Sequence, residues 1–482
     1  MSRGHTAAWL VVALSLAAPA VHAQTPRRDV NAAAADGTTA LYWAAAHNDL
    51  DAAKRLIAAG ADVSIASRYG VSALSLAALN GNAALIALLL KAGADPNTSL
   101  PDGETALLTA ARTGVADAVA VLIAGGARLD ATERTRGQTA LMWAAAEGHV
   151  DTITLLIARG ADLHARSTAG WTAWLFAVRE GRTAAVRTLL DAGANIHDTV
   201  PSTDGRRRPG GSSHEAPSGP GALHLAVGSN HFELAAYLLE RGADPNASGP
   251  GWTALHHITW MRKPGQGSNG PGPKGSGRLD SLELVRKLAA HGANLNARVT
   301  SRPGVGTTAL NLIGGTPFFL AARTADFEMM RVLAELGADP RLANEDGTTP
   351  LMAAAGAGTH SPGEDAGSEA EAIEAVKLAL ALGNDVNAVD KNGNSAMHGA
   401  AYKQLPSVVD LLVARGARID IWHRKNVMGW TPLRIAVGVH RGMNLRFHEP
   451  TADRLRRVMT AAGVSTIVEP EKVISGGTPT KN

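Results

Sequence analysis

A period of about 33 residues constrains this chain more than any other feature of its sequence. The glycines that open each predicted first helix are 33, 33, 34 and 33 residues apart, at Gly37, Gly70, Gly103, Gly137 and Gly170. The glycines of the Gly-Ala pair that follows each predicted second helix, here called the exit, keep the same intervals, at Gly60, Gly93, Gly126, Gly160 and Gly193. Two landmarks with one period predict a repeat architecture in which each unit stacks on its neighbours.

The unit from Gly137 to Arg166 shows why particular residue types recur. Thr139 stands where an N-cap hydroxyl accepts from the free N–H groups of a first helical turn. Gly148 and Gly160 end the first and the second helix, where a left-handed residue with a side chain would cost about 1–2 kcal/mol. Apolar residues such as Leu156 follow the spacing of one helical face. Each unit is therefore predicted to be a helix-turn-helix.

These units resemble ankyrin repeats, which share a Gly-x-Thr-Pro-Leu-His-x-Ala-Ala start, an apolar second helix and a Gly-Ala-Asp exit. The resemblance rests on segments such as GHVDTITLLIARGAD from Gly148 and GADPN from Gly242, and it extends from about Asp29 to Gly463. It implies an all-α solenoid of about eleven helix-turn-helix units joined by short β-hairpins. It also implies a hydrogen-bonded structural role for the histidines that keep the family's His position, which are His224, His256 and His398.

The period and its interruptions predict the domain boundaries. They are a signal peptide over 1–23, a linker or partial repeat over 24–35, regular repeats over 36–197, a Gly/Pro/Arg-rich insertion over 198–218, further repeats with loop insertions over 219–467 and a flexible tail over 468–482. A second insertion between units covers 298–313. Three more, 262–278, 359–369 and 441–450, fall between the two helices of a unit, where they would protrude from one edge as recognition loops.

The first 23 residues have the pattern of a secretory signal. Arg3 precedes an apolar run from Ala7 to Ala18, and Val21-His22-Ala23 supplies the small residues of a cleavage site. The run is too short to span a bilayer, so no membrane insertion is expected. Cleavage after Ala23 would give a periplasmic or secreted protein. The absence of cysteine excludes disulfides and thiolate metal sites.

Charge gives little indication of an anionic partner. The chain has 46 basic and 43 acidic residues, a formal net charge of +3, which provides no electrostatic footprint for nucleic acid. The run from Arg206 to Arg208 would suit either an anionic partner or a solvated loop. The expected partner is another protein, and the expected state is a monomer.

Motifs that carry chemistry fail on their context. Two G-x-G-x-x-G sequences, from Gly265 and Gly270, lie in a Pro-rich segment that follows no strand and opens no helix. The calcium-loop start at Asp390 lacks the required glycine and the final carboxylate. The pair His256-His257, with His423, His440 and His448, suits either a metal or acid-base cluster or structural histidines. No cofactor and no metal site is predicted.

One position along the repeats is a better candidate for binding. The residue after the His position, here called the slot, points in ankyrin units from the inner helix to the concave side. Along the chain the slot holds Trp43, Leu76, Thr109, Trp143, Phe176, Leu225, His257, Leu320, Ala353, Gly399 and Ile435. Apolar and aromatic residues here have the composition of interface hot spots, but the slot could equally pack inner helices together.

Aromatic residues beside the hairpin glycines add to the concave side. They are Tyr69, Trp171, Trp252 and Trp430. The predicted partner-binding residues are therefore Trp43, Tyr69, Leu76, Trp143, Trp171, Phe176, Leu225, Trp252 and His257. Hairpin residues 133–136 are expected to be free of structural duties as well.

These features favour an exported, non-catalytic scaffold that binds another protein through its concave face and hairpins. The alternative is an accessory or assembly subunit of an exported redox enzyme or hydrolase, or an enzyme that uses the inserted C-terminal half. The sequence has no recognisable nucleophile, metal or cofactor constellation, so the scaffold is the preferred hypothesis.

Overall fold

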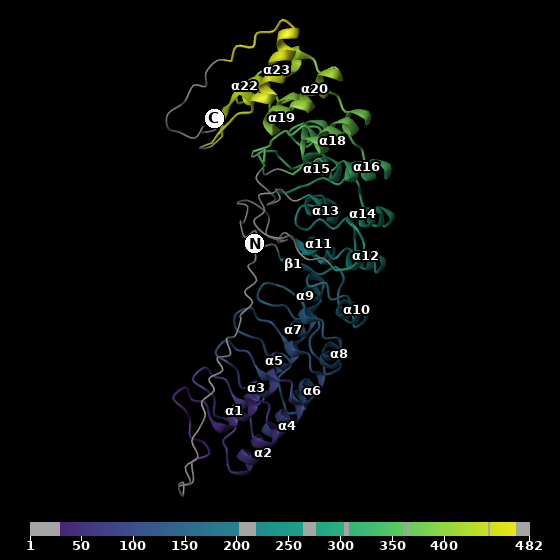
Figure 1. Ribbon diagram of the computed structural model, residues 1–482. Coiled ribbons are helices and arrows are strands. Elements are labelled where there is room, and N and C mark those ends of the chain that lie inside the picture. Colours follow the sequence, from purple (N-terminus) through teal and green to yellow (C-terminus); the bar gives the residue numbers. More distant parts are fainter. Residues whose placement is uncertain are drawn as a thin grey trace, which may run out of the picture.

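The computed structural model is a curved stack of helix pairs (Figure 1). It describes residues 29–201, 218–263, 276–302, 308–360, 362–363, 366–441 and 444–468. In each pair the first helix lies on the concave side of the curve and the second on the outer side. The chain is thus mostly helical and solenoidal, as the period predicts. None of the helices in these residues is long and apolar enough to cross a membrane.

The inner helices are α1 (Ala40–Ala46), α3 (Ala73–Leu79), α5 (Ala106–Thr113), α7 (Ala140–Glu147), α9 (Ala173–Arg179), α11 (Ala222–Gly228), α13 (Ala254–Arg262), α15 (Pro317–Arg323), α17 (Pro350–Ala354), α19 (Ala396–Lys403) and α22 (Pro432–Val437). The outer helices are α2 (Leu50–Ala58), α4 (Ala83–Lys91), α6 (Ala116–Ala124), α8 (Val150–Ala158), α10 (Thr183–Asp191), α12 (Phe232–Glu240), α14 (Ser281–Ala290), α16 (Phe327–Glu335), α18 (Glu369–Ala381), α20 (Pro406–Ala414) and α23 (Glu449–Ala461). The sequence did not predict α21 (Ile419–Trp422), a single turn before α22.

In the α7–α8 pair the threonine cap and the two helix-ending glycines have the predicted conformations. The Thr139 hydroxyl accepts from the Met142 N–H at 3.3 Å and caps α7. Gly148 and Gly160 adopt φ values of 84° and 88°, the left-handed conformation that favours glycine. Leu156 is fully buried on the inward face of α8.

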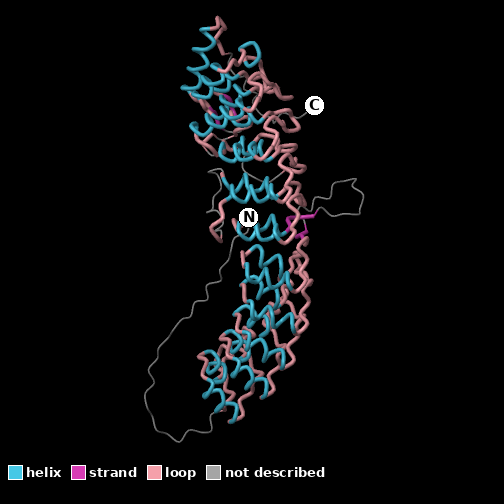
Figure 2. The backbone as a smooth tube through the Cα atoms, turned by 90° about the vertical axis from the view of Figure 1, so that its right-hand side faces the viewer, coloured by secondary structure: helices cyan, strands magenta, loops and turns pink. Residues whose placement is uncertain are grey.

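The predicted β-hairpins are mostly reduced to single bridges. In the regular repeats these join Ala66 to Ser72, Ser99 to Thr105 and Thr132 to Thr139. Pairing between strands occurs at β1 (Thr199–Pro201) with β2 (Ser218–Gly221), and at β3 (Val439–Arg441) with β4 (Asn444–Arg446). One edge of the helix stack is therefore lined mainly by turns and loops, on the right in Figure 2.

The tips of neighbouring hairpins are joined by single backbone hydrogen bonds and do not form β-ladders. The Arg68 N–H donates to the Asp36 carbonyl at 2.9 Å, and the Arg134 N–H donates to the Asp102 carbonyl at 2.7 Å. One repeat after Arg68, the equivalent hairpin position holds Pro101, and one repeat after Thr168 it holds Pro201. Proline has no N–H to donate to the preceding hairpin. The row of tips is consequently interrupted at these two prolines.

Asparagines in the exit segments join successive repeats. The Asn97 side chain donates to the Gly126 carbonyl at 3.1 Å and accepts from the Arg128 N–H at 2.9 Å. Asn31, Asn246 and Asn387 make the same pair of contacts one repeat further on. In the exit segments that follow α8 and α10, the position equivalent to Asn97 is held by His164 and His197. Neither histidine makes these two contacts.

The last helix caps the stack. In α23, Arg454 pairs with Asp410 of α20 at 2.9 Å, and Arg456 pairs with Glu449 and Asp453. Leu455 and Met459 of the same helix are fully buried. This agrees with the expected terminal helix that has one apolar face and a polar exterior.

Candidate binding surface

The slot side chains of the first repeats reach the surface of the concave side. Trp43 on α1 is 49 % exposed, and Leu76 on α3 and Trp143 on α7 are partly exposed. Trp43 is held in place, because its Nε1 donates to the Thr38 hydroxyl at 3.2 Å and its ring stacks on His47 at 5.7 Å between centroids. An aromatic ring fixed in this way loses little side-chain entropy on binding.

Arginines stack on the aromatic rings of this face. Arg68 lies over Tyr69, whose exposed fraction is 61 %, at 4.8 Å from the ring centroid. Arg112 of α5 lies over Trp143 of the next repeat at 5.1 Å. These pairs combine a cation with an apolar plane, as interface hot spots often do.

A third arginine covers two rings at the end of this region. Arg179 of α9 lies 4.8 Å from the Trp171 centroid and 5.1 Å from the Phe176 centroid. Arg112 and Arg179 both stand seven residues after the threonine that caps their helix. The sequence interpretation missed these arginines, although this shared position was the signal that could have identified them.

A polar group separates the two aromatic areas. On α5 the slot holds Thr109, which is buried and donates to Glu104 Oε1 at 2.7 Å. The same oxygen pairs with Arg112 at 3.3 Å. Glu104 therefore orients Arg112 against Trp143, and the surface alternates between apolar rings and fixed charges.

The remaining predicted residues differ in accessibility. Phe176 is 5 % exposed beneath Trp171 and Arg179, so it supports this surface from below. Leu225 on α11 and Trp252 beside its hairpin are partly exposed. His257 on α13 packs beside Trp260 at 5.9 Å between ring centroids, and burial lowers its pKa.

The later slots are closed. Leu320 on α15 and Ala353 on α17 are fully buried, and Ile435 on α22 is 4 % exposed. A Cβ on Gly399 of α19 would lie 2.8 Å from the Ala357 backbone nitrogen, in the turn that follows α17. At Gly399 the slot has no side chain because the turn after α17 lies directly on it.

The segment 308–313, here called the strap, lies against the turn that follows α17. The Thr308 hydroxyl and the Ala309 N–H donate to the Gly358 carbonyl at 3.2 and 3.0 Å. Thr308 also forms an antiparallel bridge with Thr359. The insertion 359–369 was predicted to protrude from one edge, but the structure places its first residue, Thr359, and the preceding Gly358 against Thr308 of the insertion 298–313.

Hairpin residue Glu133 corrects one expectation. The residue is 6 % exposed, and its carboxylate accepts from the N–H groups of Thr135 at 2.7 Å, Arg136 at 2.8 Å and Gln138 at 3.2 Å. This hairpin has one residue more than its neighbours, which accounts for the single interval of 34. The longer glutamate side chain stabilises the wider turn, so Glu133 is structural and not free for binding.

The histidines at the family's His position are structural. His256 Nδ1 accepts from the Thr253 N–H at 3.1 Å, and Nε2 donates to the Ala297 carbonyl at 2.9 Å. His398 makes the equivalent bonds with Ser395 and Arg424. His224 follows a glycine cap, and its buried Nδ1 has no partner in the described part of the chain.

The other suspected sites have structural explanations. Asp390 accepts from the N–H groups of Asn392 and Asn394 and from the Thr348 hydroxyl, and burial raises its pKa. In the described residues no three His, Asp or Glu side chains are grouped so as to hold a metal ion. Arg206–Arg208, the glycine motifs from 265 to 275 and the segment 1–23 lie outside the described residues.

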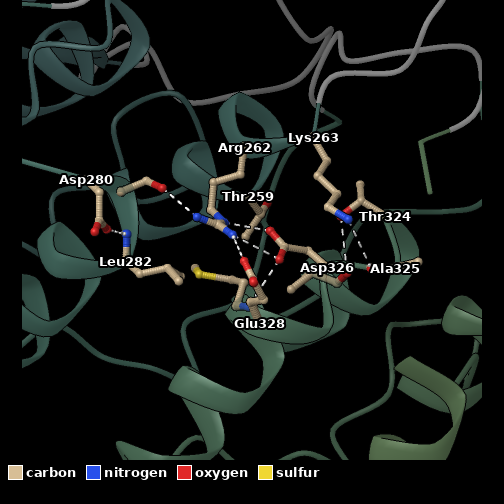
Figure 3. Close-up of polar contacts among 12 residues, drawn as sticks. Thr259, Arg262, Lys263, Asp280, Leu282, Thr324, Ala325, Asp326 and Glu328 are labelled. Carbon is tan, nitrogen blue, oxygen red and sulfur yellow. Dashed lines mark hydrogen bonds and ion pairs between the residues drawn. The ribbon is translucent and has the colours of Figure 1, made fainter. Parts of the chain in front are cut away.

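An ion-pair cluster ties the repeats together where one insertion begins (Figure 3). Arg262, at the end of α13, donates to Asp326 at 2.6 and 3.1 Å and to Glu328 at 3.3 Å. Its neighbour Lys263 pairs with Glu371 of α18 at 2.5 Å, and this bond holds the pKa of Glu371 at about 2. The cluster has no unpaired cation, so its geometry is that of a structural clamp.

Stacked helix pairs define a helical-repeat protein. Family models described as "Ankyrin repeats (3 copies)" match residues 9–100, 74–167, 136–200 and 366–443. A model described as "Ankyrin repeats (many copies)" matches residues 223–262. These matches cover more than half of the sequence, so the chain belongs to the ankyrin-repeat family.

A curated relative shows the same type of repeat at a distance. The B-cell lymphoma 3 protein homolog of Mus musculus is 33 % identical to this chain over 135 residues. The aligned region covers 28 % of this chain and 23 % of the relative. Together with the family assignment, this similarity suggests a role in protein–protein interaction.

Proposed function

We propose that this chain is an exported, non-catalytic scaffold of eleven ankyrin units. It binds a partner protein through the open face, which we define as Trp43, Tyr69, Leu76, Arg112, Trp143, Trp171 and Arg179. The observation that carries this proposal is a contrast within one slot. The slot is exposed or partly exposed on α1, α3, α7, α11 and α13 and buried on α5 and α9, whereas it is buried on all four of α15, α17, α19 and α22.

The chemistry of the open face supports this function. Exposed aromatic rings with arginines stacked on them offer large contact area together with charge-assisted hydrogen bonds. The rings are already ordered by Thr38, His47 and the arginines, so binding requires little further loss of entropy. The rigid helix stack below them keeps their spacing.

Substitutions on the open face test the proposal. The partner would first be isolated by pull-down with the wild-type protein. Trp43→Ala and Trp143→Ala should each weaken its binding about 30-fold, because a hot-spot tryptophan contributes about 2 kcal/mol. Isothermal titration calorimetry measures the change in Kd.

A matched control comes from the outer side of the stack. Tyr237 on the outer helix α12 also carries a stacked arginine, with Arg187 at 4.5 Å from its centroid. Tyr237→Ala removes an aromatic ring and a cation–π pair without touching the open face. Equal binding by wild type and both tryptophan variants, with unchanged helical content, would contradict the proposal.

Export is the second part of the proposal and has its own test. Its support is the signal pattern ending at Ala23. The full-length precursor, expressed in a bacterial host, should be recovered from the periplasmic fraction with Gln24 as its first residue. Recovery of uncleaved protein in the cytosolic fraction would contradict export.

A further inference from the structure

The step from the α9–α10 repeat to the α11–α12 repeat differs from the other steps of the stack. In the described part of the chain, α10 and α12 make less contact than any other pair of neighbouring outer helices. The inner helices at the same step, α9 and α11, remain packed on each other. The step lies in the middle of the curve, where the ribbon changes from dark blue to teal (Figure 1). The repeats are therefore joined well on the inner side of this step and poorly on the outer side.

A large side chain accounts for the wide outer gap. Arg187 of α10 occupies the position that is held in the three preceding outer helices by Ala87, Ala120 and Thr154. The distance between packed helices depends on the side chains at their contact, so a long side chain sets them further apart. The Arg187 guanidinium lies 4.5 Å from the ring centroid of Tyr237 on α12. A cation–π pair thus takes the place of close helix packing here.

An exposed ion pair also spans this gap. Arg241, which follows α12, pairs with Asp191 at the end of α10 at 2.9 Å, and the two side chains are 42 % and 65 % exposed. Solvent and salt screen such a pair, so it adds little rigidity. The exit segments add no asparagine link, because His197 holds that position and does not make its two contacts. The outer side of the step is therefore held by contacts that break at low cost.

The hairpin of this step is tied mainly to the repeats before it. Arg166 donates to Asp198 at 3.0 Å and to the Thr199 carbonyl at 3.2 Å. Among the described residues, no backbone hydrogen bond joins the β1–β2 hairpin to the next hairpin, 248–252. The row of hairpin tips is therefore interrupted after β2, as the outer helices are after α10.

The inner side of the step keeps its contacts. His231, at the start of α12, donates from Nε2 to the Arg179 carbonyl at the end of α9 at 3.2 Å. Its Nδ1 accepts from the Ser276 N–H at 3.2 Å, which fixes this tautomer. Leu223 and Val227 of α11 are 3 % and 0 % exposed. A step that is packed inside and loosely bridged outside has the geometry of a hinge, with its axis near α9 and α11.

We propose that the α10–α12 step is a hinge. The repeats of α1–α10 and the repeats from α11 onward move as two bodies about the α9–α11 contact. Because the inner helices stay together, widening of the outer gap tightens the curve and narrowing of the gap flattens it. The hinge changes the opening of the concave side without disturbing the packing inside either body. It is a property of the free protein and does not depend on the proposed function.

Distances between spin labels test the hinge. The chain has no cysteine, so introduced cysteines carry the only labels. The label sites are exposed alanines at the ends of α2, α8 and α14, namely Ala58, Ala158 and Ala290. Ala158→Cys with Ala290→Cys spans three outer-helix steps including the hinge, and Ala58→Cys with Ala158→Cys spans three steps without it. Double electron–electron resonance should give a broader distance distribution for the first pair.

Two matched substitutions locate the motion. Arg241→Gln removes the ion pair with Asp191 and should shift the Ala158–Ala290 distribution towards longer distances. Lys287→Gln removes a similarly exposed pair with Glu240 at 3.6 Å, at the closely packed α12–α14 step, and should leave the distribution unchanged. Equal widths for the two label pairs in the otherwise wild-type protein would overturn the hinge, and so would equal effects of the two substitutions.

Discussion

Buried histidines show how a single residue links the repeats to solution conditions. His256 and His398 are 0 % and 1 % exposed, and in each case Nδ1 accepts a backbone N–H while Nε2 donates to a carbonyl. This arrangement requires the neutral ring, since a protonated Nδ1 cannot accept. Burial lowers the pKa of both side chains to about 4 from 6.5.

These depressed pKa values predict loss of stability in acid. The unfolded chain binds protons at these rings below about pH 6.5, whereas the folded chain excludes them until about pH 4. The contribution of each neutral histidine is therefore complete above pH 6.5 and falls as the pH drops from there towards 4. Between pH 7 and pH 5 each should lose about 2 kcal/mol of unfolding free energy.

Urea denaturation at both pH values measures this loss. His398→Asn should be less stable at pH 7 but should lose about 2 kcal/mol less than wild type on going to pH 5. An unchanged pH dependence in His398→Asn would show that its ring does not titrate as described.

The clamp at Arg262 leads to a second residue-scale prediction. Its side chain is 13 % exposed and that of Asp326 is 1 % exposed. Arg262→Met leaves the Asp326 charge buried without its partner and should lower the unfolding free energy by about 3–5 kcal/mol. Adding Asp326→Asn removes that charge but keeps a helix cap, so the double variant should recover most of the loss in thermal unfolding.

At the scale of elements, the exit asparagines provide a matched pair of substitutions. Asn97→Ala removes two hydrogen bonds between repeats, while His164→Asn can create the equivalent bonds to the Gly193 carbonyl and the Asn195 N–H. The first should destabilise and the second stabilise the adjoining repeats, by about 0.5–1.5 kcal/mol per bond. Native-state hydrogen exchange of α5–α10 would detect both changes, and destabilisation by His164→Asn would contradict this account.

The period predicted the helices well because each depends on residues close in sequence. Thr139, Gly148 and Gly160 determine where α7 and α8 begin and end, and equivalent residues have the same roles in other units. The contact between the strap and Gly358 depends on residues about fifty positions apart, and it occurs outside the period. No local pattern indicates it, which is why the insertion 359–369 was predicted to protrude.

The candidate site was predicted in part for the same reason. The slot could be followed along the chain, so the aromatic residues were found. Whether a slot is open depends on what covers it, and the sequence does not show that the turn after α17 lies on Gly399. Glu133 was predicted to have no structural role because the sequence interpretation did not link the extra residue of this hairpin to the long glutamate side chain that stabilises it.

At the scale of the whole molecule, the two ends of the solenoid differ in how they are joined. The α1–α10 repeats are linked through neighbours, by hairpin tips and by asparagines such as Asn97. The later repeats keep such links, for example at Asn246 and Asn387, and add the Lys263–Glu371 pair, which joins the end of α13 to α18 two repeats further along. Exposed or partly exposed slot residues occur at one end, on α1, α3 and α7, whereas the slots on α15, α17, α19 and α22 are all buried.

Hydrogen exchange of the isolated complex tests this division most directly. Relative to the free protein, the bound protein should exchange more slowly at the Arg68, Arg134 and Thr168 hairpins and along α1, α3, α5, α7 and α9. The strap and helices α15, α17 and α19 should exchange at unchanged rates. Protection confined to the strap region or to the outer helices would contradict the account.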